Sequence, residues 1–308
     1  MSDTAQTESG ITTAERMGYP PEARLLIINA DDFGMCHDEN EATIVGLTQG
    51  LFTSSTILTT CPWFEEAAEF ARSTPHADLG VHLTLNAEWD RYKWGPVLGR
   101  DEVPSLVDER GYLWPDVPAV FAHDRLEEVE IELQAQIDKA IASGIDVTHL
   151  DCHMGPLHLR ADYHRIYLKL AGNFGLPIRL TSRRVMRQLG MADILADLDR
   201  AGILYPDNFV HPGPKVIEET ESFWTEVLRN LKPGISEIYC HPALAREELR
   251  ACARDFAQRQ RDFDFFTAEK TRRLIKDEGI ELIGYRLLRD KMNTLSGSPS
   301  SSGEGAGG

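Results

Sequence analysis

The chain has 308 residues and a formal net charge of −17, from 32 Lys and Arg against 49 Asp and Glu. This charge repels phosphate backbones and anionic lipid, so it disfavours nucleic-acid and membrane partners, and the length suits one large α/β domain. Five scattered cysteines without a CxxC pair, a polar start, and the lack of any apolar run near the roughly 18 residues of a membrane span together predict a reduced, cytoplasmic compartment.

Residues 1–22 show no helical or strand periodicity, and we expect them to form a flexible arm. The first predicted strand covers residues 25–34, LLIINADDFG, because a continuous apolar run with a polar end is typical of a parallel strand covered on both faces. Adjacent residues point to opposite faces of a strand, so Asp31 and Asp32 share one site only if the chain turns there. Gly34 is expected to supply the turn. The alternative is a loop acid followed by the N-cap of the next helix.

Helical and strand patterns alternate along the rest of the chain. Helices are predicted over 38–49, 63–72, 125–143, 163–174, 184–201, 217–230 and 268–277, and strands over 55–60, 79–85, 147–150, 178–180, 208–210, 236–240 and 281–285. This alternation predicts an α/β barrel of seven or eight parallel strands, which forms a single domain over residues 23–290. Residues 291–308 end in SGSPSSSGEGAGG, a composition that does not pack, and are expected to form a disordered tail.

Residues 86–122 interrupt the alternation with aromatic residues interleaved with prolines. The segment is too long for an ordinary connection, and long loops in compact domains are commonly lids or binding loops. We therefore predict that it covers the site and that Trp89, Tyr92 or Trp94 contacts a sugar ring. The alternative is that these aromatic side chains form a minor core beneath the loop.

Polar residues that are suited to catalysis or metal binding stand at the ends of four predicted strands. They are Asp31 and Asp32, His82, the group His149, Asp151 and His153, and His241. In a parallel barrel the carboxyl ends of all strands meet at one face, so residues far apart in sequence become neighbours. Any one of these histidines alone would be better explained as a structural residue. Their coincidence at four strand ends favours a common site.

Two imidazoles and one carboxylate are a frequent ligand set for a divalent metal, and they leave positions open for water and substrate. His82, His153 and one aspartate would supply that set. His149 or Asp151 would orient a ligand from behind, an aspartate beside the metal would act as general base, and His241 in its protonated form would donate a proton to a leaving amine.

Four motifs, NADDFG, GVHLTL, THLDCH and YCHPA, in this order and spacing, resemble those of the YdjC-like carbohydrate deacetylase family, which includes chitooligosaccharide deacetylases. The resemblance covers about residues 25–285. It implies a distorted (β/α) barrel related to that of the polysaccharide deacetylases, and metal-dependent removal of N-acetyl groups from amino sugars. By the same resemblance Asp32, His82 and His153 are the metal ligands, Asp31 is the base and His241 is the acid.

The third motif departs from the family pattern, since many members continue it with further histidines and this chain continues it as HMGPLH from His153. That change leaves the sugar and its chain length open. The alternative function is another metallohydrolase on the same barrel, an amidohydrolase or esterase that acts on a non-sugar. A binding protein without turnover is disfavoured because ligands, base and acid are all present. The sequence leaves open whether the metal is Mg²⁺ or Zn²⁺ and whether the chain forms a homodimer.

Overall fold

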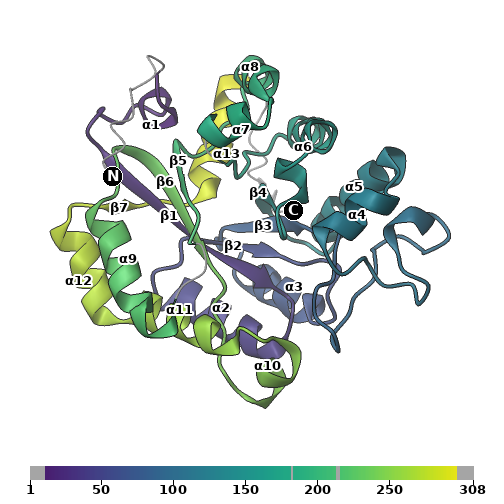
Figure 1. Ribbon diagram of the computed structural model, residues 1–308. Helices are drawn as coiled ribbons and strands as arrows, with labels where there is room; N and C mark the ends of the chain where they lie inside the picture. The colour runs from purple at the N-terminus through teal and green to yellow at the C-terminus, as the bar shows by residue number, and fades with distance from the viewer. Residues whose placement is uncertain (1–10, 182, 213–215, 297–308) are drawn as a thin grey trace, which may run out of the picture.

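A curled sheet of parallel strands forms the centre of the computed structural model, which describes residues 11–181, 183–212 and 216–296 (Figure 1). The strands are β1 (Arg24–Phe33), β2 (Ser54–Ile57), β3 (Leu79–Leu83), β4 (Val147–Cys152), β5 (Asn208–Val210), β6 (Gly234–Cys240) and β7 (Glu281–Leu282). Their order is β4-β3-β2-β1-β6-β5, and β7 pairs with the beginning of β1. The predicted α/β fold with a distorted parallel barrel is confirmed.

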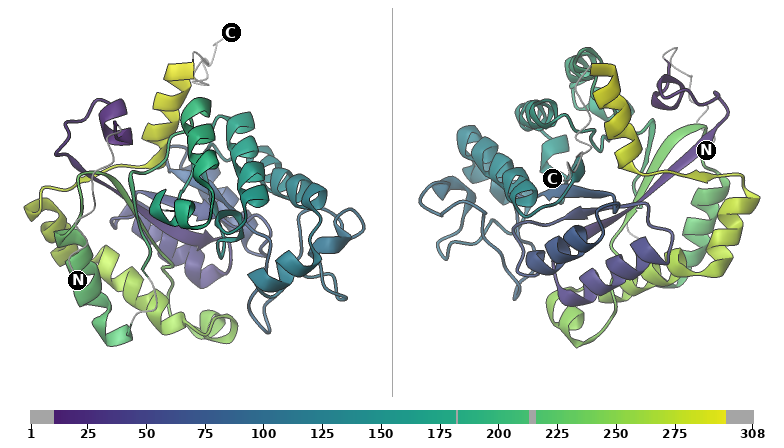
Figure 2. Two further views of the ribbon diagram at one scale, coloured as in Figure 1. Left: turned by 45° about the horizontal axis from the view of Figure 1, so that its top comes forward. Right: turned by 180° about the vertical axis from the view of Figure 1, so that it is seen from behind.

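The barrel is incomplete between its two outermost strands, β4 and β5. The strand predicted over 178–180 is reduced to an isolated parallel bridge between Ile178 and Leu150. On its other side, the N–H of Ile178 donates to the carbonyl of Leu204 at 3.1 Å, and Leu204 precedes β5. The sheet therefore curls around a centre without closing, as the views in Figure 2 also show.

Helices surround the sheet in all views (Figures 1 and 2). They are α1 (Thr13–Arg16), α2 (His37–Thr48), α3 (Phe64–Ser73), α4 (Val117–His123), α5 (Leu126–Ala142), α6 (Ala161–Phe174), α7 (Arg183–Gln188), α8 (Ala192–Ala201), α9 (Thr220–Arg229), α10 (Glu247–Cys252), α11 (Phe256–Thr267), α12 (Glu269–Asp277) and α13 (Tyr285–Ser296). The single helix predicted over 184–201 is divided into α7 and α8 at Gly190, whose φ of +74° ends a helical turn. The sequence analysis missed α4, α10, α11 and α13, and also α1 within the predicted arm.

Both predicted chain ends need correction. The arm predicted over 1–22 contains α1, whose Thr12 forms a capping box with Glu15. The arm is also docked, because the N–H of Thr13 donates to a carboxylate oxygen of Asp207 at 2.6 Å. At the other end α13 continues to Ser296, so the tail predicted over 291–308 was placed too early. Residues 1–10 and 297–308 of these predictions lie outside the described residues.

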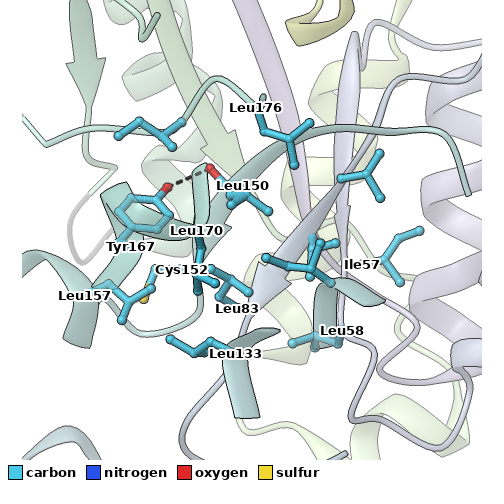
Figure 3. Close-up of a cluster of buried hydrophobic side chains, with 14 of the residues drawn as sticks. Ile57, Leu58, Leu83, Leu133, Leu150, Cys152, Leu157, Tyr167, Leu170 and Leu176 are labelled. Atoms are coloured by element: carbon cyan, nitrogen blue, oxygen red, sulfur yellow. Dashed lines mark hydrogen bonds between the residues drawn. The ribbon is translucent and has the colours of Figure 1, made fainter. Parts of the chain in front are cut away.

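The core lies between the sheet and the helices, and Figure 3 shows the part of it around β3, β4 and α6. There the side chains of Leu83, Leu150 and Leu170 pack together with no solvent exposure. The hydroxyl of Tyr167, on α6, donates to the carbonyl of Leu150 at 2.7 Å and to that of Arg179 at 3.1 Å. Tyr167 thus ties β4 to the segment that carries Arg179. Within the described part of the chain, every helix is too short or too polar to cross a membrane.

Candidate metal and catalytic site

The end of β1 bends so that two adjacent carboxylates reach the same cleft. The register between β1 and β2 shifts between Ala30 and Phe33, and Asp32 has a φ of +70°. This left-handed conformation is uncommon for a residue other than glycine, although aspartate tolerates it better than most. The turn therefore begins at Asp32 itself, and Gly34, with a φ of +96°, continues it. Asp31 and Asp32 both line the cleft as a result.

Two of the predicted histidines converge on one carboxylate oxygen of the predicted Asp32. Asp32 Oδ1 lies 3.4 Å from His82 Nε2 and 3.2 Å from His153 Nδ1, and one candidate ligand atom from each of the three side chains lies within 4.8 Å of the others. All three residues are buried. Among the described residues, Asp32 Oδ1 has no hydrogen-bond partner. A buried carboxylate oxygen without a donor is costly, so this arrangement fits a cation between the oxygen and the two ring nitrogens.

Each of the two imidazoles has a carboxylate behind it. His82 Nδ1 lies 2.6 Å from Asp151 Oδ1, and His153 Nε2 lies 2.9 Å from Glu88 Oε2. A carboxylate in this position fixes the ring orientation and directs the opposite nitrogen toward a metal. Burial lowers the pKa of His82, but the carboxylates around it, Asp151 first and then Asp32 and Asp31, together raise that pKa to about 9. Asp151 thus lies behind His82, in the position expected for a residue that orients a ligand. The corresponding residue behind His153 is Glu88, which the sequence analysis did not identify.

His149 does not take part in this arrangement, which corrects one prediction. Its ring is fully buried below the site and stacks on Tyr285, with centroids 3.9 Å apart and 8° between the planes. Its Nδ1 lies 2.9 Å from the Thr148 hydroxyl. Although His149 precedes Asp151 by two residues and shares its face of β4, it is one step deeper in the barrel, and within the described part of the chain it makes no hydrogen bond to a predicted ligand.

The second aspartate of the pair is held by a buried arginine. Both carboxylate oxygens of Asp31 accept hydrogen bonds from Arg179, each at 2.7 Å, and Asn29 Nδ2 donates to Oδ1 at 2.8 Å. Burial raises the pKa of Asp31, but the Arg179 guanidinium overcomes this effect and lowers the pKa to about 2. Arg179 also pairs with Asp151 and Glu237, each at 2.8 Å. Asp31 is therefore ionised and fixed in orientation.

A second buried arginine divides the roles of the two Asp32 oxygens. Arg259 Nη1, from α11, donates to Asp32 Oδ2 at 2.9 Å. The other oxygen, Oδ1, accepts no hydrogen bond in the described structure and faces the imidazoles of His82 and His153. The same guanidinium pairs with Glu39 on α2 and with Asp255. Although burial raises the pKa of Asp32, the nearby His241 and Arg259 hold it well below its usual range.

His241 lies at the carboxyl end of β6, on the wall of the same cleft. Its Nε2 is 3.9 Å from Asp32 Oδ2, and its side chain is 32% exposed. Burial lowers the pKa of His241, and the attraction of Asp32 reduces this effect only in part. His241 thus lies beside the Asp32 carboxylate and is accessible from the cleft.

The cleft has a volume of about 610 Å³ and contains only part of the predicted aromatic rim. Trp89 lines it with 9% exposure, next to Glu88. Tyr92 donates its hydroxyl to the carbonyl of Met35, and Trp94 is 2% exposed and donates Nε1 to the carbonyl of Asn86 at 3.0 Å. Tyr92 and Trp94 are outside the cleft lining, so for these two the minor-core alternative describes the structure.

This placement predicts different effects for the aromatic residues. Trp94→Ala is expected to lower the free energy of unfolding by about 3–5 kcal/mol, because it leaves a large cavity in a packed core. Tyr92→Phe removes one hydrogen bond and should cost about 1 kcal/mol. Urea denaturation measures both values. A loss below about 1 kcal/mol for Trp94→Ala would contradict the core assignment.

Three residues that the sequence analysis missed complete the site: Glu88, Arg179 and Arg259. Arg179 could have been found by the same argument as the histidines, since it lies within the predicted strand 178–180 near its carboxyl end. Glu88 follows β3 in the loop beyond His82, but loop acids are too common to signal a role. No sequence pattern indicated a role for Arg259, because the helix that carries it, α11, was not predicted.

The fold and the site together define an α/β half-barrel protein with a buried Asp-His-His group at the carboxyl ends of its parallel strands. The family model described as YdjC-like protein matches residues 25–277, so the chain belongs to the YdjC-like family. The predicted resemblance is thereby confirmed.

Two relatives and one solved structure align with this chain over nearly their whole length. A carbohydrate deacetylase from Enterococcus faecalis is 33% identical over 267 residues, which cover 85% of this chain and 97% of that protein. A carbohydrate deacetylase from Thermus thermophilus is 33% identical over 286 residues, which cover 90% and 98%. A crystal structure from Enterococcus faecalis, described as a putative cellobiose-phosphate cleavage protein, superposes with a TM-score of 0.74 at 32% identity and covers 86% of this chain and 99% of its own.

Proposed function

We propose that this protein is a metal-dependent hydrolase that removes acetyl groups from N-acetylated amino sugars or short oligosaccharides. The observation that carries the proposal is Asp32 Oδ1, a buried oxygen that lacks a hydrogen-bond partner in the described structure and faces a ring nitrogen of His82 and one of His153. The similarity to proteins named carbohydrate deacetylases supports the substrate class.

The residues present fit one divalent ion. Asp32, His82 and His153 would hold it, and Asp151 and Glu88 would orient the two imidazoles. Two nitrogen ligands favour Zn²⁺ or another transition ion over Mg²⁺, which prefers oxygen. When bound, the ion supplies Lewis-acid polarisation of the acetyl carbonyl and makes water a better nucleophile at neutral pH.

Two further side chains divide the proton transfers that amide hydrolysis requires. Asp31, which is ionised and oriented by Arg179, accepts the proton of the attacking water. An amine leaves only after it gains a proton, and His241 on the cleft wall supplies it in its protonated form.

Metal removal tests the first part of this proposal. Dialysis against a chelator is expected to abolish acetate release from N-acetylated sugars, because the ligand set then lacks its Lewis acid. Zn²⁺ or Mg²⁺ added back singly should restore the rate, and metal analysis should find one ion per chain. Full activity in protein with no detectable metal would overturn the metal dependence.

A substrate panel tests the second part. Acetate release is measured from N-acetylglucosamine, short N-acetylated oligomers, simple acetamides and aryl acetates. We expect the N-acetylated sugars to give the highest kcat/KM. Turnover of simple amides or esters without turnover of any sugar would replace the proposal by the general amidohydrolase or esterase alternative.

A further inference from the structure

Two aromatic side chains on neighbouring strands line the cleft and lie outside the insertion that was expected to bind the sugar. Phe209 lies on β5 and Tyr239 on β6, and β5 pairs in parallel with β6 (Figure 1). Their rings are parallel, with centroids 5.5 Å apart and 6° between the planes. Both residues are half-buried, so each keeps surface open to the cleft.

Arg179 fixes this aromatic pair relative to the site. Its guanidinium carbon lies 4.8 Å from the centroid of Tyr239 and 5.7 Å from that of Phe209. The same guanidinium makes both hydrogen bonds to Asp31. In addition, His241 stands edge-on to Tyr239, with centroids 5.6 Å apart and 88° between the planes. The aromatic pair is therefore in contact with the residue that clamps Asp31 and with His241 itself.

The charged residues of the cleft lining point to an uncharged ligand. Each arginine that lines the cleft in the described residues is already paired: Arg179 with Asp31, Arg259 with Asp32, and Arg254 with Asp90. The two further carboxylates of the lining also have partners, since Glu88 faces His153 and Asp255 pairs with Arg259. An anionic ligand such as a sugar phosphate would therefore have to displace a carboxylate from a buried arginine or compete for Arg254, whose pair with Asp90 is exposed.

We propose that Phe209 and Tyr239 form a platform on which an uncharged pyranose ring of the substrate stacks. This inference rests on the proposed function and names the part of the cleft that recognises the sugar. The C–H face of a pyranose is apolar and matches the face of an aromatic ring, while few polar groups nearby set the orientation. A ring held here lies beside Arg179 and His241, so its N-acetyl group has the catalytic residues within reach.

Substitutions at Phe209 test the platform in the full-length, metal-loaded protein. Phe209→Leu keeps the residue apolar and removes the flat ring, whereas Phe209→Tyr keeps the ring. We expect Phe209→Leu to raise KM for N-acetylglucosamine or its short oligomers about tenfold, with kcat changed less than about threefold. Phe209→Tyr should retain a KM close to that of the wild type. An unchanged KM in Phe209→Leu overturns the platform.

Two further measurements test whether the effect is confined to Phe209 and whether the ligand is uncharged. Tyr112→Ala, which removes a 37% exposed ring outside the cleft lining, is the matched control and should leave KM unchanged. N-acetylglucosamine 6-phosphate should bind at least about tenfold more weakly than N-acetylglucosamine, as measured by calorimetry, because both buried arginines of the lining are already paired with carboxylates. Tighter binding of the phosphate overturns the uncharged-ligand part of the inference.

Binding measured without turnover distinguishes a failure of the platform from a failure of the proposed function. If the wild type releases no acetate from any sugar yet binds N-acetylglucosamine oligomers, and Phe209→Leu weakens that binding about tenfold, the platform stands and the deacetylase function fails. If the wild type does release acetate and Phe209→Leu neither weakens binding nor raises KM, the deacetylase function stands and the platform fails.

Discussion

Asp32→Asn is expected to lower the affinity for a divalent metal on the order of 10²-fold or more, and turnover should be lost with it. The reason is that a neutral amide oxygen replaces the carboxylate oxygen Oδ1, which faces His82 and His153. Asparagine suits this experiment because it tolerates the φ of +70° that Asp32 adopts, whereas alanine would add backbone strain. Calorimetric titration with Zn²⁺ and metal analysis of the purified variant measure the effect.

Asp255→Asn is the matched control for this experiment. Asp255 also pairs with Arg259, through Nε at 2.9 Å, but it is not one of the three proposed metal ligands. The control should retain one bound metal per chain. If Asp32→Asn binds metal as tightly as the wild type, Asp32 is not a ligand and the site has been assigned wrongly.

Asp31→Asn and His241→Ala are each expected to keep the metal and to lose turnover of the natural amide, on the order of 10²-fold or more. Arg179 keeps its contacts with Asp151 and Glu237 when Asp31 is neutralised, so the loss should come from the missing base and not from a collapsed site. Metal analysis and initial rates of acetate release are measured together on both variants.

An activated aryl acetate separates the two roles. Its leaving group needs no proton, so His241→Ala should lose much less rate on this ester than on the amide. Asp31→Asn should be equally poor on both substrates, because both reactions begin with attack by water. The assignment fails if Asp31→Asn empties the metal site, or if His241→Ala hydrolyses the amide at the wild-type rate.

Much of the fold and of the candidate site follows from local patterns. The apolar run before Asp31 and Asp32 identifies a buried parallel strand, and a parallel sheet brings the ends of its strands to one face whatever lies between them. That rule alone is enough to group His82, His153 and His241 with the two aspartates. The predictions are weakest in the last third of the chain, where α11 lacks a strong periodic pattern and takes its position from packing, and where the amphipathic pattern of α13 was overlooked.

The sequence by itself determined which strand ends carry reactive groups, but only the tertiary structure decided the surroundings of each group. Arg179 reaches Asp31 from 148 positions along the chain, and Arg259 reaches Asp32 from 227 positions away. These two contacts give the adjacent carboxylates different surroundings, so that one is clamped through both oxygens and the other keeps Oδ1 available to a cation. Local periodicity reports which face of an element is buried, and it carries no information about which distant side chain will meet that face.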